Sequence, residues 1–128
     1  MSVTVTSIMQ AINLEWDINA EEIIVKRMDR LLGYKDGTNA HQFRLYIKNG
    51  EEFVDLIDNA LVATMFFRKA SGQIVEIAGV VDYVIGTDQF IKFTLPNTVY
   101  EQGAFRADIR LEKAFDQRTI IIIEGNVL

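Results

Sequence analysis

The sequence predicts an all-β fold, and three observations support this prediction. Apolar and polar residues alternate along several short runs, which is the pattern of strands with one buried face. Turn-forming residues, among them Asn49–Gly50, Gly72 and Pro96, separate these runs. No convincing helical pattern occurs after His41. Short strands at such intervals are typical of an antiparallel β-sandwich or barrel, and we expect an immunoglobulin-like (Ig-like) β-sandwich.

The first forty residues follow this pattern least clearly. The segment Val3–Thr6 is rich in β-branched residues and is strand-like. The β-branched run Ile23–Val25 also favours a strand, but a helical stripe overlaps it, formed by Ile24, Met28, Leu31 and Leu32. We favour a strand over Glu22–Arg27 followed by a helical turn. Residues 1–40 are therefore expected to be a segment, with or without a short helix, that packs on the sandwich.

From His41 onward the strands are easier to assign. They are expected within residues 41–48, 61–69, 73–86, 90–95, 103–112 and 119–128. Residues 73–86 form either one long strand or two short ones with a kink near Gly79. Pro96 has no N–H to donate and therefore ends the strand before it. The inward-facing residues expected to form the core are Phe43, Leu45, Phe67, Phe93, Leu95, Phe105, Ala107 and Ile109.

Composition limits the classes of protein to which the chain can belong. Its 128 residues predict one domain, without disulfides because the chain has no cysteine. The net charge is −5, and the 13 Lys and Arg residues are scattered along the sequence, so nucleic-acid binding is not expected. No signal-peptide pattern and no apolar run of membrane-spanning length occurs. We expect a soluble protein that is not a secretory precursor.

No residues form a recognisable catalytic, cofactor-binding or metal-binding motif. His41 is the only histidine, and no serine or cysteine pairs with it in a known arrangement. The acidic pairs Glu21–Glu22 and Glu51–Glu52 point to opposite sides of an extended chain and cannot converge. The segment Asp36–Asn39 lacks the spaced acidic ligands of a calcium loop. We therefore predict no cofactor, no metal and no enzymatic activity.

The candidate interface residues are apolar side chains expected on the surface. They are Ile120, Ile122, Tyr46, Phe66 and Tyr83, with burial in the core as the alternative for the three aromatic residues. The run Ile120–Ile123 would make a strand apolar on both faces. We interpret it as a free sheet edge, covered in part by Val3–Trp16 and lying near the contact with partner subunits.

Several segments occur in an order that resembles a known family. The segments are FRLYIKNGEEFVDL, KASG, GTDQFIKFTLPN, GAFRADIRLE and QRTIIII. Together they resemble the N-terminal domain of the baseplate upper protein family of phages that infect Gram-positive bacteria. The matching positions are Asp55, Leu56, Lys69, Gly72, Phe90, Leu95, Pro96, Gly103, Ala107, Ile109 and Leu111. The match runs from His41 to the C-terminus. It departs from the family at Ile120–Ile123 and in the longer segment 28–39.

The resemblance implies a structural virion protein without catalytic function. Its domain would be the N-terminal module of a longer chain, made in the host cytoplasm and placed in the tail baseplate. The module would dock on the central (distal) tail hub protein as part of a homo-oligomeric assembly. The rest of the chain would carry receptor-binding proteins for host attachment, without membrane insertion. The alternative is a stand-alone carbohydrate-binding or adhesin-like sandwich, which would need aromatic residues clustered on one exposed face or loop end.

Overall fold

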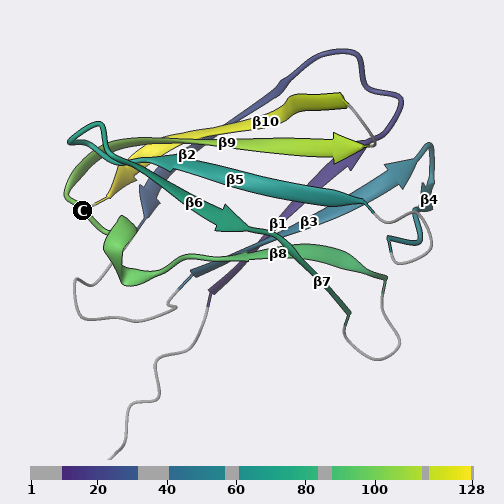
Figure 1. Cartoon of the computed structure of the whole chain (residues 1–128), viewed down its shortest axis with the longest axis horizontal. Helices are drawn as coiled ribbons and strands as arrows, with labels where there is room; N and C mark the ends of the chain where they lie inside the picture. The colour runs from purple at the N-terminus through teal and green to yellow at the C-terminus, as the bar shows by residue number, and fades with distance from the viewer. Residues whose placement is uncertain (1–9, 32–40, 57–60, 84–87, 114–115, 128) are drawn as a thin grey trace, which may run out of the picture.

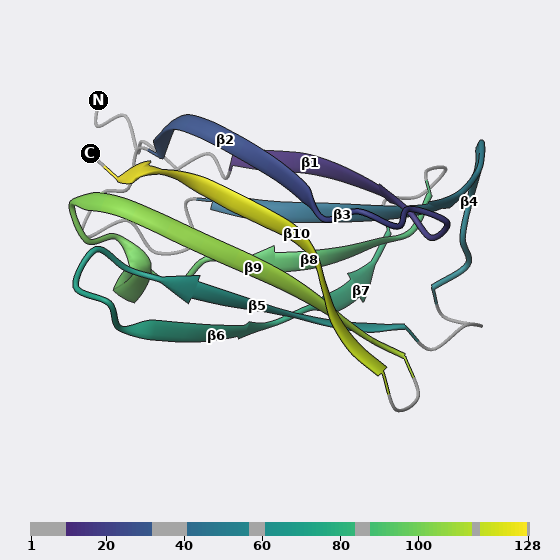
Figure 2. The same ribbon diagram turned by 90° about the horizontal axis from the view of Figure 1, so that it is seen from above.

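The fold is a sandwich of two β-sheets, seen as two layers in Figures 1 and 2. The computed structural model describes residues 10–31, 41–56, 61–83, 88–113 and 116–127. Within these residues the helical content is one 3₁₀ turn, Asn97–Val99. The predicted all-β sandwich class is therefore confirmed.

Each sheet contains five strands, and we call them sheet A and sheet B. Sheet A has the order β1 (Gln10–Asp17), β3 (His41–Asn49), β8 (Phe90–Thr94) and β7 (Val80–Asp82), with β4 (Glu52–Phe53) also paired to β3. Sheet B has the order β2 (Ile24–Leu31), β10 (Asp116–Val127), β9 (Gly103–Lys113), β5 (Val62–Arg68) and β6 (Ile74–Ala78).

The two N-terminal strands depart from the antiparallel pairing that the sequence suggested. Strand β1 is parallel to β3, and β2 is parallel to β10, whereas the other pairs are antiparallel. Parallel neighbours need a crossover connection. Between β1 and β3 the chain makes this crossover through β2 in the opposite sheet. Residues 10–31 thus supply a strand to each sheet instead of packing on a finished sandwich.

The strand expected over Glu22–Arg27 is present from Ile24 onward. The helical turn expected after Arg27 is wrong as far as Leu31, because the strand continues to that residue. Strand β2 continues to Leu31 because its backbone pairs with β10 from Ile24, opposite Ile121, to Leu31, opposite Val127. These ladder hydrogen bonds outweigh the local helical pattern. The expected strand Val3–Thr6 and the turn Asp36–Asn39 lie outside the described residues.

The long run around Gly79 is two strands that belong to different sheets. Strand β6 ends at Ala78 in sheet B, and β7 begins at Val80 in sheet A. The Gly79 N–H donates to the Ala63 carbonyl at 2.9 Å. A Cβ on Gly79 would lie 2.5 Å from Ile91 Cγ2 and 2.6 Å from that carbonyl oxygen. The chain can therefore pass between the sheets here only because this residue has no side chain.

The core lies between the sheets, and all eight predicted core residues are buried there, none more than 4% exposed. The rings of Phe67 and Phe105 stack with centroids 4.9 Å apart. Strand β1 adds Leu14 and Trp16 to the same core. Strand β8 ends just before the Leu95–Pro96 step, as predicted, and the 3₁₀ turn then leads toward β9.

Candidate functional site

The isoleucine run does not form a free sheet edge, so that prediction is wrong. Strand β10 pairs with β9 on one side and with β2 on the other. The described part of the segment expected to cover it, residues 10–16, lies in sheet A. A bulge between Thr119 and Ile121 makes Ile120 an extra residue, so Ile120 and Ile121 both face the core. Ile120 is 1% exposed and cannot belong to a surface site, whereas Ile122 is half-buried.

The structure does not bring the remaining candidate residues together in one place. Tyr46 lies on the outer face of sheet A, and Tyr83, which is 57% exposed, follows β7. Phe66 and Ile122 do share a face, the outer face of sheet B. They flank Asp108, which is opposite Phe66 on one side and opposite Ile122 on the other. The outer face of sheet B is therefore the surface on which two of the candidates meet.

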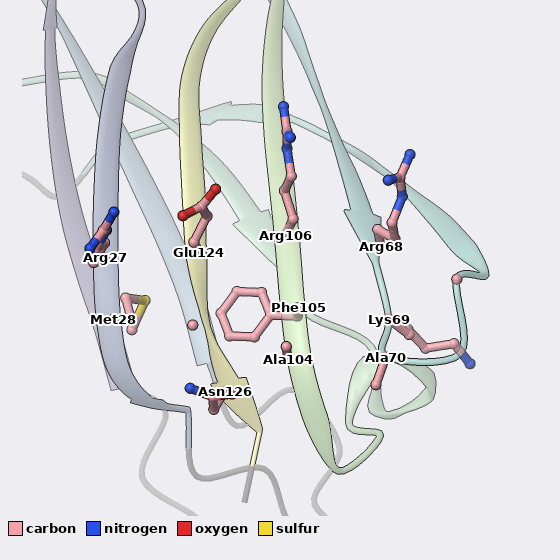
Figure 3. A pocket seen from close by; sticks show the side chains of 12 residues that line it. Arg27, Met28, Arg68, Lys69, Ala70, Ala104, Phe105, Arg106, Glu124 and Asn126 are labelled. Atoms are coloured by element: carbon pink, nitrogen blue, oxygen red, sulfur yellow. The ribbon is translucent and has the colours of Figure 1, made fainter.

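That face gathers basic residues that are far apart in the sequence. Cross-strand register aligns Arg27 of β2, Glu124 of β10, Arg106 of β9 and Arg68 of β5 in one row (Figure 3). The next row contains Val25, Ile122, Asp108 and Phe66, and Arg110 follows on β9. We call these nine residues the arginine face. The sequence showed only its central strand, where Arg106, Asp108 and Arg110 alternate with core residues.

Two of the four arginines on this face are already engaged. The Arg106 Nε donates to Asp108 Oδ1 at 3.0 Å, and the Arg110 guanidinium lies 4.3 Å from the centre of the Phe66 ring. Among the residues that the structure describes, no carboxylate lies within ion-pair distance of Arg27 or Arg68. These two guanidiniums are therefore available to bind an external acceptor.

A hollow of about 650 Å³ lies at one end of the arginine face. Strands β2, β9 and β10 and the end of β5 form it, and Figure 3 shows the side chains that line it. Its described charged residues are Arg27, Arg68, Lys69, Arg106 and Glu124. Lys69 is held by Glu101, with its Nζ 3.5 Å from Oε2. The excess of cations in an acidic protein makes this hollow a place where an acidic group would be attracted.

The aromatic residues on the outer face of sheet A pack against one another. The Tyr46 ring lies 5.4 Å from the Phe90 ring and 5.8 Å from the Phe53 ring, measured between centroids. The Arg44 guanidinium lies over Phe90, which is only 1% exposed, and the Lys48 ammonium lies over Phe53. This packing buries Phe90 and partly covers Tyr46, whereas Phe53 stays 38% exposed, so the three rings do not form one open aromatic platform.

His41 forms a buried pair with Tyr100, with Nδ1 and the phenol oxygen 2.7 Å apart. Burial lowers the pKa of His41, and burial raises the pKa of Tyr100 to about 12. Both groups are therefore neutral at pH 7. The Tyr100 phenol ionises less readily than the phenol of a free tyrosine. The geometry is that of a satisfied polar pair at the start of β3.

Neither a metal centre nor a membrane-spanning helix occurs among the described residues. Across these ranges, no group of three His, Cys, Asp or Glu residues lies close enough together to hold a metal ion. No helix in the same ranges has the length and apolar character needed to cross a membrane.

The fold and the arginine face define the chain as a β-sandwich with one cation-rich outer face. Comparison with known proteins adds no family to this description. The sequence matches no protein-family model, and no curated protein is detectably similar to it. The resemblance to the baseplate upper protein family therefore stays a prediction.

Proposed function

We propose that this protein is a non-catalytic docking module that binds an acidic surface of a partner protein through the arginine face. The observation that carries the proposal is the row Arg27–Glu124–Arg106–Arg68, which has free guanidiniums in an otherwise acidic protein. Arginine binds carboxylates in a bidentate manner and is enriched in protein interfaces. A pre-formed row on a sheet positions these groups with little loss of entropy on binding.

The apolar row beside the arginines supplies the second part of a protein-binding surface. Val25 is 54% exposed, and Ile122 and Phe66 are half-buried. Burying such side chains against a partner contributes about 25 cal/mol per Å² of apolar area. The carboxylates Glu124 and Asp108 on the same face would repel a phosphate backbone. This mixture of charge and apolar surface favours a protein partner over a nucleic acid.

The setting that we propose is the tail baseplate of a phage, with the central tail hub protein as the partner. This part of the proposal is supported by the order of the five sequence segments that resemble the baseplate upper protein family. The longer chain would then link the hub to receptor-binding proteins for host attachment. The alternative, a carbohydrate-binding or adhesin-like module, finds less support because the aromatic rings of sheet A pack against one another.

The proposal is tested by binding of the purified protein to the recombinant tail hub protein of the same phage. We compare the double variant Arg68→Glu/Arg110→Glu with a control that has the same change in charge on sheet A, Lys48→Glu/Lys92→Glu. We expect the first variant to lose affinity by about 100-fold, the effect of removing two charge-assisted contacts of about 1.5 kcal/mol each. The control should bind like the wild type.

Circular dichroism and thermal melts establish that both variants are folded before binding is compared. Equal loss of affinity in the two variants would contradict docking through the arginine face. Detection of the chain by mass spectrometry in purified phage particles tests the virion setting separately. Its absence from the particles, or binding to a DNA duplex in place of the hub, would overturn that setting.

A further inference from the structure

Among the described residues, strand β2 is an outermost strand of sheet B. It pairs with β10 on one side, and no described strand pairs with its other side. Ile24 and Val25, at the start of β2, are 39% and 54% exposed, and the preceding Ile23 is 50% exposed. Proteins usually protect such an edge because its free backbone groups and apolar side chains attract another strand. The exposed apolar start of β2 is therefore a place where another strand can pair.

Charge distinguishes β2 from the other outermost strands of the described sheets. Strands β1, β4, β6 and β7 contain only acidic charged residues, which are Glu15, Asp17, Glu52, Glu76 and Asp82. Strand β2 contains Lys26, Arg27, Asp29 and Arg30, and exposed Glu21 and Glu22 precede it. Its apolar start, Ile23–Val25, has Glu21 and Glu22 on one side and Lys26 and Arg27 on the other. Acidic and basic groups thus lie on opposite sides of an apolar centre. An antiparallel copy of the same segment would place each sign of charge opposite the other.

We infer that β2 pairs with β2 of a second copy of this chain, antiparallel and about a two-fold axis that passes through Ile24 perpendicular to sheet B. A two-fold interface must be self-complementary, and this segment is. The axis keeps the outer face of one sheet B continuous with the outer face of the other. Side chains opposite each other must then lie on the same face.

The register follows from the order of the residues. With Ile24 opposite its own copy, Ile23 lies opposite Val25, so the apolar residues meet one another. Glu22 then lies opposite Lys26, and Glu21 lies opposite Arg27. Opposite charges directly across a strand pair stabilise it, and apolar pairs do the same.

Other centres give a poorer match. A centre at Val25 places Ile23 opposite Arg27, and a centre at Ile23 places Glu22 opposite Ile24. Both shifts remove the ion pairs and place charges opposite apolar side chains. The Ile24 centre is therefore the register that combines the two kinds of pair.

Two local features allow this pairing. Residues 21–23 are exposed and precede β2, so the strand can extend over them when a second copy binds. The Lys26 ammonium makes one long hydrogen bond, 3.4 Å to the Asn13 carbonyl, which a carboxylate can replace. Figure 2 shows β1 and β2 along the same side of the molecule, with β6 on the opposite side. The edge at which the second copy would pair is therefore far from the other edge of sheet B, which is β6. In the dimer Glu21 of the second copy engages Arg27, and Arg68 remains free for a partner protein.

The first test uses the absence of cysteine from the chain. Residues directly opposite in an antiparallel pair have Cα atoms about 4.5–5.5 Å apart, which suits a disulfide. The Ile24→Cys variant should therefore form a covalent dimer on mild oxidation. The control Val62→Cys, a residue that is 52% exposed on an inner strand of sheet B, should stay monomeric on a non-reducing gel. Equal cross-linking of both variants would overturn the proposal.

The second test uses the charges and does not depend on cysteine. Glu22→Lys and Lys26→Glu should each abolish the dimer seen by sedimentation equilibrium, because like charges then lie opposite each other. Mixing the two variants should restore a heterodimer, since every opposed pair is again of opposite sign. A wild-type chain that remains monomeric at about 100 times the concentration used for binding, or a mixture that stays monomeric, would overturn the proposal. Neither variant alters Arg68 or Arg110, so this outcome is separable from hub binding.

Discussion

The outer faces of the two sheets carry similar basic residues but use them differently. On sheet A each described cation is engaged by a neighbour on its own sheet. The contacts are Lys48 to Glu15 at 3.8 Å, Lys92 to Asp82 at 3.0 Å and Arg44 to Gln42 at 2.8 Å. On sheet B, Arg27 and Arg68 have no such partner among the described residues. Cross-strand register, and not composition, decides whether a surface cation is satisfied within the protein or available to a partner.

Both faces depend on one shared core, and breaking that core should have the largest effect. Phe93 of sheet A is 0% exposed and Phe105 of sheet B is 4% exposed. Truncation of either residue to alanine should lower the free energy of unfolding by about 3–5 kcal/mol, because each leaves a cavity between the sheets. Urea denaturation measures the loss. If either variant unfolded at the wild-type midpoint, that ring would not support the shared core.

The crossing between the sheets at Gly79 should be the next most sensitive position. Gly79→Ala places a methyl group against the Ala63 carbonyl, which cannot move without disturbing β5, and should cost about 3 kcal/mol. The matched control is Gly72→Ala, where φ is +93° and no atom lies within 4 Å of the added carbon. That control should cost only about 1 kcal/mol of backbone strain. Thermal melts in which the control lost more stability than Gly79→Ala would contradict the steric argument.

A pH-dependent loss of stability should mark the buried polar end of sheet A. Burial lowers the pKa of His41 below 6.5, so the folded protein holds it neutral while the unfolded chain binds a proton. The unfolded state is therefore favoured as the pH falls below about 6.5, and the full stability is present above that value. Urea midpoints at pH of about 7.5 and 5.5 measure the loss. Because His41 is the only histidine, the His41→Gln variant should have a flatter profile across this window. An equally steep profile in that variant would assign the loss to other groups.

The smallest expected effect compares the faces directly. Arg44→Ala removes a hydrogen bond to Gln42 and the contact with the Phe90 ring, and should cost about 1 kcal/mol. Arg68→Ala removes a side chain that has no ion-pair partner among the described residues and should change stability by less than about 0.5 kcal/mol. Paired urea titrations at one pH measure both. Equal losses would mean that Arg68 stabilises the fold and is not reserved for binding.

Much of the sandwich could be predicted because alternation is a local property. A strand with one buried face must alternate, so the inward faces of β3, β5, β8 and β9 were visible in the sequence. Pro96 and Gly72 likewise marked connections because their backbone chemistry restricts them. The N-terminal strand that became β2 was only partly visible, since its local pattern suits a helix nearly as well.

The candidate site was much less visible. Phe66 and Ile122 were among the predicted surface residues and do share the arginine face, but Arg27, Arg68 and Glu124 were missed. These three residues come from strands separated by up to about a hundred positions and meet only through register. Ile120 was misassigned because a bulge of one residue reverses the facing of the residues beyond it. No signal in the sequence marked that bulge.

Local patterns in the sequence were enough to predict that the chain forms strands, which residues of most of those strands turn inward, and where most of the strands end. These properties depend on neighbours within a few positions along the chain. Three features depend on how distant segments pack. Strand β10 lies between β2 and β9, Gly79 carries the chain between the sheets, and the arginines align on sheet B. Strand order and register are set by burial and hydrogen bonding between distant segments, which a local pattern does not encode.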